Sequence, residues 1–70
     1  MIIAKKPATI IKEIREALNR KGFSDNIPLD IFYAEFMFNT GYGKRKIWEW
    51  TQNFELIKLI EIKDGKVNFL

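Results

Sequence analysis

The chain has 70 residues, of which 47% are hydrophobic and 14% aromatic, enough apolar material for one small folded domain. It contains neither cysteine nor histidine, which excludes disulfides, thiolate metal sites and the commonest general base. The formal net charge is +3, and it is unevenly spread. Residues 1–23 carry six bases and two acids, residues 24–41 three acids and no base, and residues 42–70 six bases and four acids. Two basic segments around an acidic one suggest a single basic face.

No targeting or catalytic signature is recognisable. Met1–Ala4 is too short for the apolar segment of a signal peptide, and no apolar run approaches the roughly 18 residues of a membrane span. The acids are scattered singly, and no nucleophile has a base nearby. We therefore expect one domain over residues 1–70, located in the cytoplasm, with no membrane partner, catalytic residue, metal or cofactor. An enzyme is not expected.

The first predicted helix begins at Pro7, a residue well suited to a first turn. Gly22 is expected to end this helix in a left-handed conformation. The preceding segment, Met1–Lys6, is interpreted either as an arm or as a strand that joins the C-terminal hairpin. The apolar residues that recur at helical spacing and should face the core are Ile10, Ile11, Ile14, Ala17 and Leu18.

A second helix is predicted over roughly Leu29–Asn39, after a short strand bridge near Ile27. Its expected buried stripe comprises Leu29, Phe32, Tyr33, Phe36 and Met37. Ile31 and Phe38 lie seven residues apart on a different face, with Glu35 between them. A helix that is apolar nearly all round is difficult for a 70-residue monomer to hide. We therefore predict a homodimer, with Ile31 and Phe38 in its interface.

A third helix, at about 44–56, follows a turn signal at residues 39–41. Gly43 takes its N-cap position, where glycine is tolerated although it offers no side-chain acceptor. The residues expected to be buried are Ile47, Thr51 and Phe54, reinforced by Trp50 and closed off by Ile57. The residues expected on the opposite, exposed face are Lys44, Arg45, Trp48, Glu49 and Gln52.

The C-terminal segment Leu59–Leu70 is typical of a β-hairpin. Asp64-Gly65 favours a two-residue turn. Folding the chain about this turn gives four cross-strand pairs, and hydrophobic alternation supports the same register. The predicted pairs are Ile60 with Phe69, Glu61 with Asn68, Ile62 with Val67, and Lys63 with Lys66.

This order of elements resembles a winged helix-turn-helix DNA-binding domain, an α+β fold. The resemblance rests on L-D-I-F-Y-A-E-F-M-F-N-T-G-Y-G-K-R-K-I-W-E-W and on F-E-L-I-K-L-I-E-I-K-D-G-K-V. With the first helix included, it covers nearly the whole chain. Two positions depart from the family pattern: Gly43 stands where Ser or Thr often caps the recognition helix, and Lys58 where glycine often follows it.

The basic turn Lys44-Arg45-Lys46 opposes the dipole of its own helix, so local stability does not explain it, whereas phosphate binding does. Arg45 and Gln52 have the side chains suited to guanine and adenine edges, with Lys44 and Lys46 on phosphates. Glu49 shares this face. A solvated basic turn without a ligand is the alternative.

Three further positions have two interpretations each. Trp48 either covers the edge of the core or stacks on DNA or a partner protein. Tyr42 either packs beneath the turn or places its hydroxyl on a phosphate. Lys63 and Lys66 repel each other across the predicted wing at 63–66, which a phosphate would relieve, although solubilising charge on an edge strand is equally typical.

The predicted function is sequence-specific binding of double-stranded DNA by a small transcriptional regulator of viral, plasmid or archaeal type. The helix at about 44–56 would lie in the major groove and the wing on the backbone or in the minor groove. Lys5 and Lys6 would add phosphate contacts. The alternative is a winged-helix module that binds protein within a replication, transcription or chromosome complex, through Ile31, Phe38, Trp48 and Tyr42.

Overall fold

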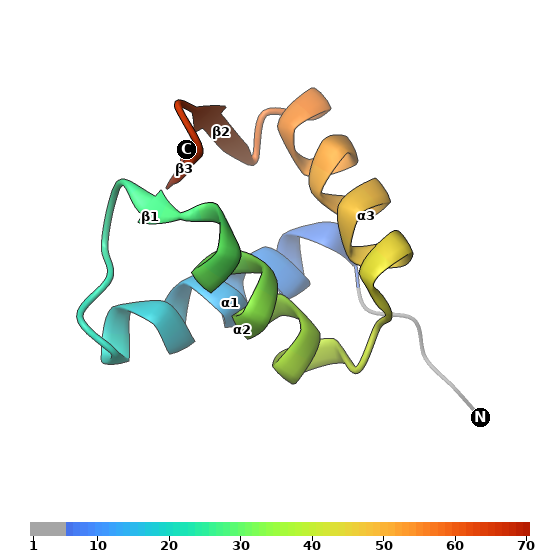
Figure 1. The fold of residues 1–70 in the computed structure, drawn as a ribbon, viewed down its shortest axis with the longest axis horizontal. Coiled ribbons are helices and arrows are strands. Elements are labelled where there is room, and N and C mark those ends of the chain that lie inside the picture. The colour runs from blue at the N-terminus through green and yellow to red at the C-terminus, as the bar shows by residue number, and fades with distance from the viewer. Residues whose placement is uncertain (1–5) are drawn as a thin grey trace.

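The computed structural model describes residues 6–70, which form three helices and three strands (Figure 1). The elements in chain order are α1 (Pro7–Arg20), β1 (Ile27–Pro28), α2 (Leu29–Thr40), α3 (Lys44–Leu56), β2 (Ile60–Lys63) and β3 (Lys66–Phe69). The arm or strand expected at Met1–Lys6 falls outside the described residues, except for Lys6, which is exposed and precedes α1.

Helix α1 ends as its sequence predicts. Gly22 has a φ of 93°, a left-handed conformation that a side chain would disfavour. Its N–H donates to the carbonyl of Asn19 (3.0 Å), and the N–H of Phe23 donates to the carbonyl of Leu18 (2.9 Å). These two bonds satisfy carbonyls that the helix end leaves without partners. All five residues predicted to face the core from α1 are buried.

Helices α2 and α3 are joined by three residues, which fixes them as a helix-turn-helix pair. Gly41 ends α2 with a φ of 77°. The hydroxyl of Thr40 donates to the carbonyl of Phe36 (2.8 Å) and accepts from the N–H of Tyr42 (3.2 Å), so one side chain bridges the end of α2 and the turn. Gly43 is the N-cap of α3, as expected.

The three strands form an antiparallel sheet in the order β1-β3-β2. All four predicted hairpin pairs are present, from Ile60 with Phe69 to Lys63 with Lys66. Asp64 and Gly65 have φ values of 53° and 72°, which is typical of the type I′ turn that favours Asp-Gly. The strand expected near Ile27 pairs with Val67. The hairpin register was therefore predicted correctly.

The core lies between the three helices and the sheet, and aromatic rings dominate it. Phe32, Phe36 and Phe54 are fully buried. The Phe36 ring stacks on Phe54, with 5.6 Å between the ring centres, and meets Phe32 edge to face at 6.0 Å. Trp50 packs edge-on against Phe54 (5.7 Å) and extends the aromatic cluster to Tyr42. Ile47, Thr51 and Phe54 form the buried side of α3, as predicted.

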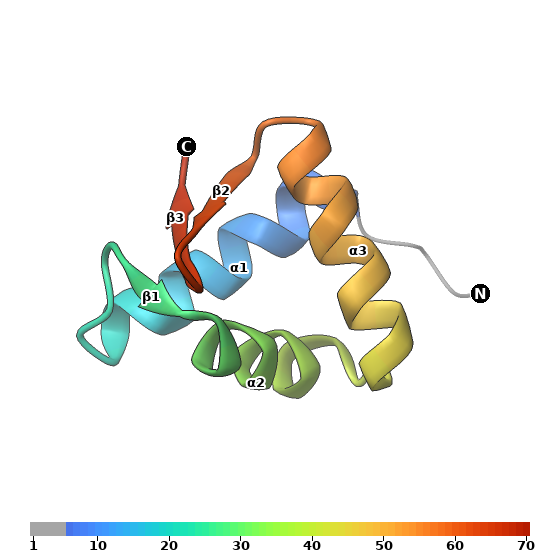
Figure 2. The same ribbon diagram turned by 45° about the horizontal axis from the view of Figure 1, so that its top comes forward.

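This arrangement is a winged helix: a three-helix bundle with a C-terminal hairpin as the wing (Figure 2). The α+β fold class predicted from the sequence is thus confirmed. Among residues 6–70, none of the helices has the length and apolarity that crossing a membrane requires.

Two predictions about burial were wrong, and the burial of one acidic residue was not predicted. Ile57 does not close the core: it is 53% exposed, because it is the C-cap of α3, beyond the helix's buried side. Met37 was placed in the buried stripe of α2 but is 40% exposed, because α3 covers only part of that side. Glu35, which lies between Ile31 and Phe38 along α2, is buried, and Lys21 reaches it from the end of α1 with an Nζ–Oε1 distance of 2.6 Å.

Lys58 takes the conformation that glycine often takes after a recognition helix. Its φ is 67°, and its N–H donates to the carbonyl of Glu55 (3.1 Å). The N–H of Leu59 donates to the carbonyl of Phe54 (2.9 Å), which completes the same end motif as in α1. The helix-to-wing connection therefore keeps its geometry despite the lysine.

Candidate nucleic-acid interface

The first turn of α3 presents three exposed cations, Lys44, Arg45 and Lys46. Among the described residues, none of them makes an ion pair. The N-cap residue of α3, Gly43, offers no side-chain cap. The first helical hydrogen bond runs from the N–H of Ile47 to the carbonyl of Gly43 (3.0 Å). Within residues 6–70, the N–H groups of Lys44, Arg45 and Lys46 have no hydrogen-bond partner, so they are available to an anion.

The three cations point to different sides of α3, because successive residues of a helix lie about 100° apart. Lys46 lies on the flank of the turn, with its Nζ 4.0 Å from the centre of the Tyr42 ring, a cation–π contact. Lys44 lies on the other flank and lines a pocket with α2. Arg45 lies between them on the outer face. One bound phosphate would not engage all three.

The outer face of α3 contains the residues predicted to read bases. Arg45, Glu49 and Gln52 follow at helical spacing and are all exposed. Trp48 stands beside them and is 56% exposed. Its interpretation as a residue that covers the core edge fits only in part, since more than half of the side chain is open to solvent.

Tyr42 is half-buried and packs against the core, with its ring 6.1 Å from Phe36 and 5.6 Å from Trp50. The sequence left two interpretations of Tyr42 open, and its ring takes the first of them, packing beneath the turn. The other side of that ring carries the ammonium of Lys46. Tyr42 therefore holds a lysine in place at the start of α3.

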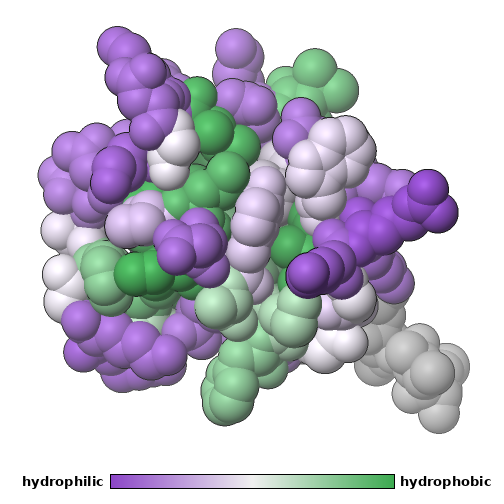
Figure 3. All heavy atoms as spheres, in the orientation of Figure 1, coloured by the Kyte–Doolittle hydropathy of each residue, from purple (hydrophilic) through white to green (hydrophobic). Residues whose placement is uncertain are grey.

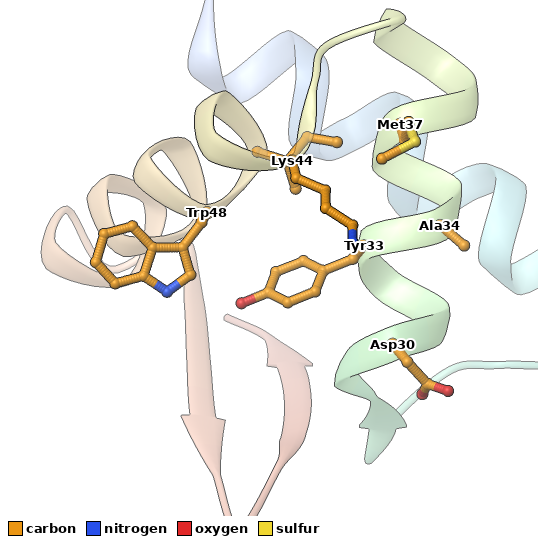
Figure 4. A pocket seen from close by; sticks show the side chains of 7 residues that line it. Asp30, Tyr33, Ala34, Met37, Lys44 and Trp48 are labelled. Atoms are coloured by element: carbon orange, nitrogen blue, oxygen red, sulfur yellow. The ribbon is translucent and has the colours of Figure 1, made fainter.

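A pocket of about 520 Å³ separates α2 from the first half of α3 (Figure 4). Its lining residues are Asp30, Tyr33, Ala34, Met37, Lys44, Ile47 and Trp48. Figure 4 shows Lys44 extending from α3 toward α2 beside Tyr33. Burial raises the pKa of the Tyr33 phenol above its usual value, so this group stays a neutral donor near neutral pH. This pocket was not predicted from the sequence, because Met37 and Tyr33 were interpreted as core residues.

The wing tip is short and tied to the start of α2. The N–H of Leu29 donates to the carbonyl of Gly65 (3.0 Å), and Pro28 lies opposite Lys66 in the β1–β3 pair. Lys63 and Lys66 are exposed and directly opposite each other. The wing therefore presents two cations at a position fixed by the rest of the sheet.

The two basic groups lie at opposite ends of α2 (Figure 2). The hairpin turn is beside the first residue of α2, and the basic turn of α3 follows its last. Because α2 has 12 residues, the ends are about 18 Å apart. This exceeds the roughly 12 Å width of the major groove. With α3 in that groove, the wing would contact the backbone beyond it.

The two residues predicted as a dimer interface differ in exposure. Phe38 is 86% exposed, and the Nζ of Lys21 lies 6.0 Å from the centre of its ring. Ile31 is half-buried and packs partly against the core. The surface over α2 is green in Figure 3, with hydrophilic residues to either side.

Within residues 6–70, no group of acidic side chains is arranged to hold a metal ion. Comparisons of the chain with known protein families, with curated proteins and with solved structures found no match. Its function must therefore be argued from the residues and geometry described above.

Proposed function

We propose that this chain binds double-stranded DNA as a small transcriptional regulator, with α3 in the major groove and the β2–β3 wing on the flanking backbone. The observation that carries this proposal is the first turn of α3. It combines three exposed cations, which make no ion pair with any other residue of 6–70, and a helix N-terminus without a side-chain cap. Cations there oppose the helix dipole, at about 0.3–1 kcal/mol each, so stability alone does not favour them.

Phosphate and base contacts are divided between the flanks and the centre of α3. In this proposal Lys44 and Lys46, which lie on the two flanks of the exposed first turn, would each contact one of the two phosphate strands that border the groove. Arg45 and Gln52, on the outer face, are placed for base edges, where a guanidinium or an amide makes paired hydrogen bonds. Lys63 and Lys66 supply the wing contact.

The experiment measures affinity for random duplex DNA by fluorescence anisotropy over a range of salt concentrations. A DNA-binding protein loses affinity with salt, with a slope of about −0.9 in log–log form for each phosphate contact. Lys44→Ala and Lys66→Ala should each lower the slope by about 1. Lys12→Ala is the matched control, because Lys12 is an exposed lysine of α1, which lies behind α2 and α3 in Figure 1.

Base reading is tested separately by selecting bound sites from random duplexes. Arg45→Ala should flatten the preference at one position by about 1–3 kcal/mol and leave the others unchanged. An absence of duplex binding at low salt, or equal effects of Lys44→Ala and Lys12→Ala, would refute the proposal.

The second candidate is a protein-binding module, and the exposed apolar side chains favour it. Phe38 and Trp48 are 86% and 56% exposed, which is unusual for rings of this size in a small monomer. In this alternative the basic residues keep the protein soluble. Two results would support this alternative: an affinity for duplex DNA that does not change with salt concentration, and binding of a partner protein that the Trp48→Ala substitution abolishes.

A further inference from the structure

The outward face of α2 is formed by residues four apart, Asp30, Ala34 and Phe38, and all three are exposed. Residues at this spacing form one ridge along a helix. A groove runs on each side of the ridge. One is the pocket toward α3 described above. The other faces the end of α1 and is lined by Lys21, Ile31, Ala34, Glu35 and Phe38.

Ala34 lines both grooves and stands at the middle of the ridge. An alanine at this point lets another helix approach closely, whereas Phe38, one turn further on, protrudes. The same surface therefore contains a protruding ring and the hollows to receive one. A surface that is complementary to itself in this way is what a two-fold interface requires, because each partner contributes the same residues.

We propose that a second copy of this chain docks on α2, with the two α2 helices antiparallel and the two-fold axis passing at Ala34. In this arrangement the residue four positions after Ala34 meets the residue four positions before it. Phe38 of one protomer therefore lies beside Asp30 of the other, in the near end of the groove that Asp30, Ala34 and Met37 line. Met37 and Ile31, on the two sides of the ridge, are covered in part.

Charge complementarity favours a second copy over an unrelated apolar partner. Lys21 lies over the Phe38 ring, at 6.0 Å, so the docked ring brings an ammonium group to Asp30 across the interface. Asp30 makes no ion pair among the described residues; its Oδ1 accepts only from the N–H of Ile31 (3.0 Å). Lys21 already holds Glu35 and has two further donors. The symmetry makes this ion pair twice.

The expected dimer is weak. Its centre is one pair of helices, each about 18 Å long, whereas stable interfaces bury about 1,200–2,000 Å². We expect a monomer–dimer equilibrium with a dissociation constant in the micromolar range or above. The outer face of α3, with Arg45 and Gln52, is not part of this interface, so dimerisation and base reading can be tested separately.

The absence of cysteine from the sequence allows a direct test by cross-linking. Packed helices have axes about 8–10 Å apart, and each Cα lies about 2.3 Å from its axis. Two Cα atoms facing each other on the two-fold axis are then about 3.4–5.4 Å apart, a range that overlaps the roughly 4.4–6.8 Å of a disulfide. Ala34→Cys should therefore cross-link under mild oxidation at least about tenfold faster than a control cysteine.

Leu56→Cys is the control, because Leu56 is an equally prominent exposed apolar residue, near the end of α3. Equal rates for the two variants, or faster cross-linking at Leu56, would overturn the proposed axis.

Sedimentation equilibrium supplies the second measurement. The mass of the wild-type protein should rise above 8.3 kDa as its concentration increases toward about 1 mM, the range in which a micromolar complex forms. Phe38→Glu and Asp30→Lys should each shift this rise to at least about tenfold higher concentration, the latter by setting a cation against Lys21. Leu56→Glu should not. A monomeric wild-type protein at about 1 mM would overturn the proposal. If the dimer proposal fails in this way, the DNA proposal can still hold. Salt-dependent DNA binding by the monomeric Phe38→Glu variant would show that it does.

Discussion

Replacing Lys58 by glycine should stabilise this protein, although the change removes a side chain. Lys58 is held at a φ of 67°, where a residue with a Cβ loses about 1–2 kcal/mol relative to the right-handed regions. Glycine relieves this strain, but it also gives the unfolded chain more conformational freedom, which lowers the free energy of unfolding by about 0.4–1 kcal/mol. Loss of a cation from a helix C-terminus takes a few tenths more. The net gain is about 0.5 kcal/mol.

The assay is urea unfolding followed by circular dichroism, with Lys58→Ala as the matched control. Alanine loses the charge but keeps the strain, so it should be slightly less stable than the wild type, and glycine should exceed it by about 0.5–1 kcal/mol, or roughly 2–8 °C in Tm. The reciprocal variant is Gly22→Ala, at a φ of 93° with open space around the new Cβ, which should lose about 1 kcal/mol. If Lys58→Gly is no more stable than Lys58→Ala, the positive φ of Lys58 does not lower the stability of the protein, and the argument from backbone strain is refuted.

Three further changes separate stability from binding. Lys66→Glu should stabilise the hairpin by about 0.2–1 kcal/mol, because it replaces repulsion from Lys63 by attraction, and should weaken duplex binding measured by anisotropy. Phe36→Ala should lose about 3–5 kcal/mol in urea unfolding, since the ring is fully buried at the centre of the aromatic cluster. Lys21→Ala should lose about 1–2 kcal/mol in the same assay, because it leaves the buried Glu35 carboxylate without a partner, although exposure of Lys21 limits the effect.

Matched controls accompany these changes. Lys66→Ala removes the repulsion from Lys63 without adding an attraction, so its gain in stability should be smaller than that of Lys66→Glu. Lys12→Ala removes an exposed lysine of α1 without an ion-pair partner among the described residues. A loss of stability in Lys66→Glu would contradict the argument that Lys63 and Lys66 repel each other. Equal stability of Lys21→Ala and Lys12→Ala would contradict the argument that Lys21 stabilises the buried Glu35.

The sequence predicted most of the fold because local signals agreed with one another. Asp64-Gly65 set the turn, alternation set the register, and Gly22 and Gly43 marked helix boundaries close to where they lie. Each of these features depends on a few neighbouring residues. The strand at Ile27, which needs a partner 40 positions away, was predicted only as a minimal bridge, and the structure forms a two-residue strand there.

The burial errors arose where tertiary packing decided between equally apolar residues. On α2, Phe36 and Met37 are adjacent and both apolar, and the sequence placed both in the core. Only the position of α3 determines that one is buried while the other borders a pocket. Glu35 was missed for a related reason, because its partner Lys21 comes from another helix. The same limit hid the pocket itself, which two helices form together.

Two groups of cations lower the local stability of the elements that carry them, and both support the proposed function. Lys44, Arg45 and Lys46 oppose the dipole of α3, and Lys63 opposes Lys66 across the wing. Natural sequences keep unfavourable local choices mainly where function needs them. Both groups are cationic, exposed and fixed by rigid elements, one at each end of α2. A single polyanion that contacts both groups would relieve both, whereas solubility alone would be served by lysines placed anywhere on the surface. The proposed DNA ligand would account for the two together, provided that it passes from the first turn of α3 to the wing without covering the ridge of α2 that the proposed dimer uses.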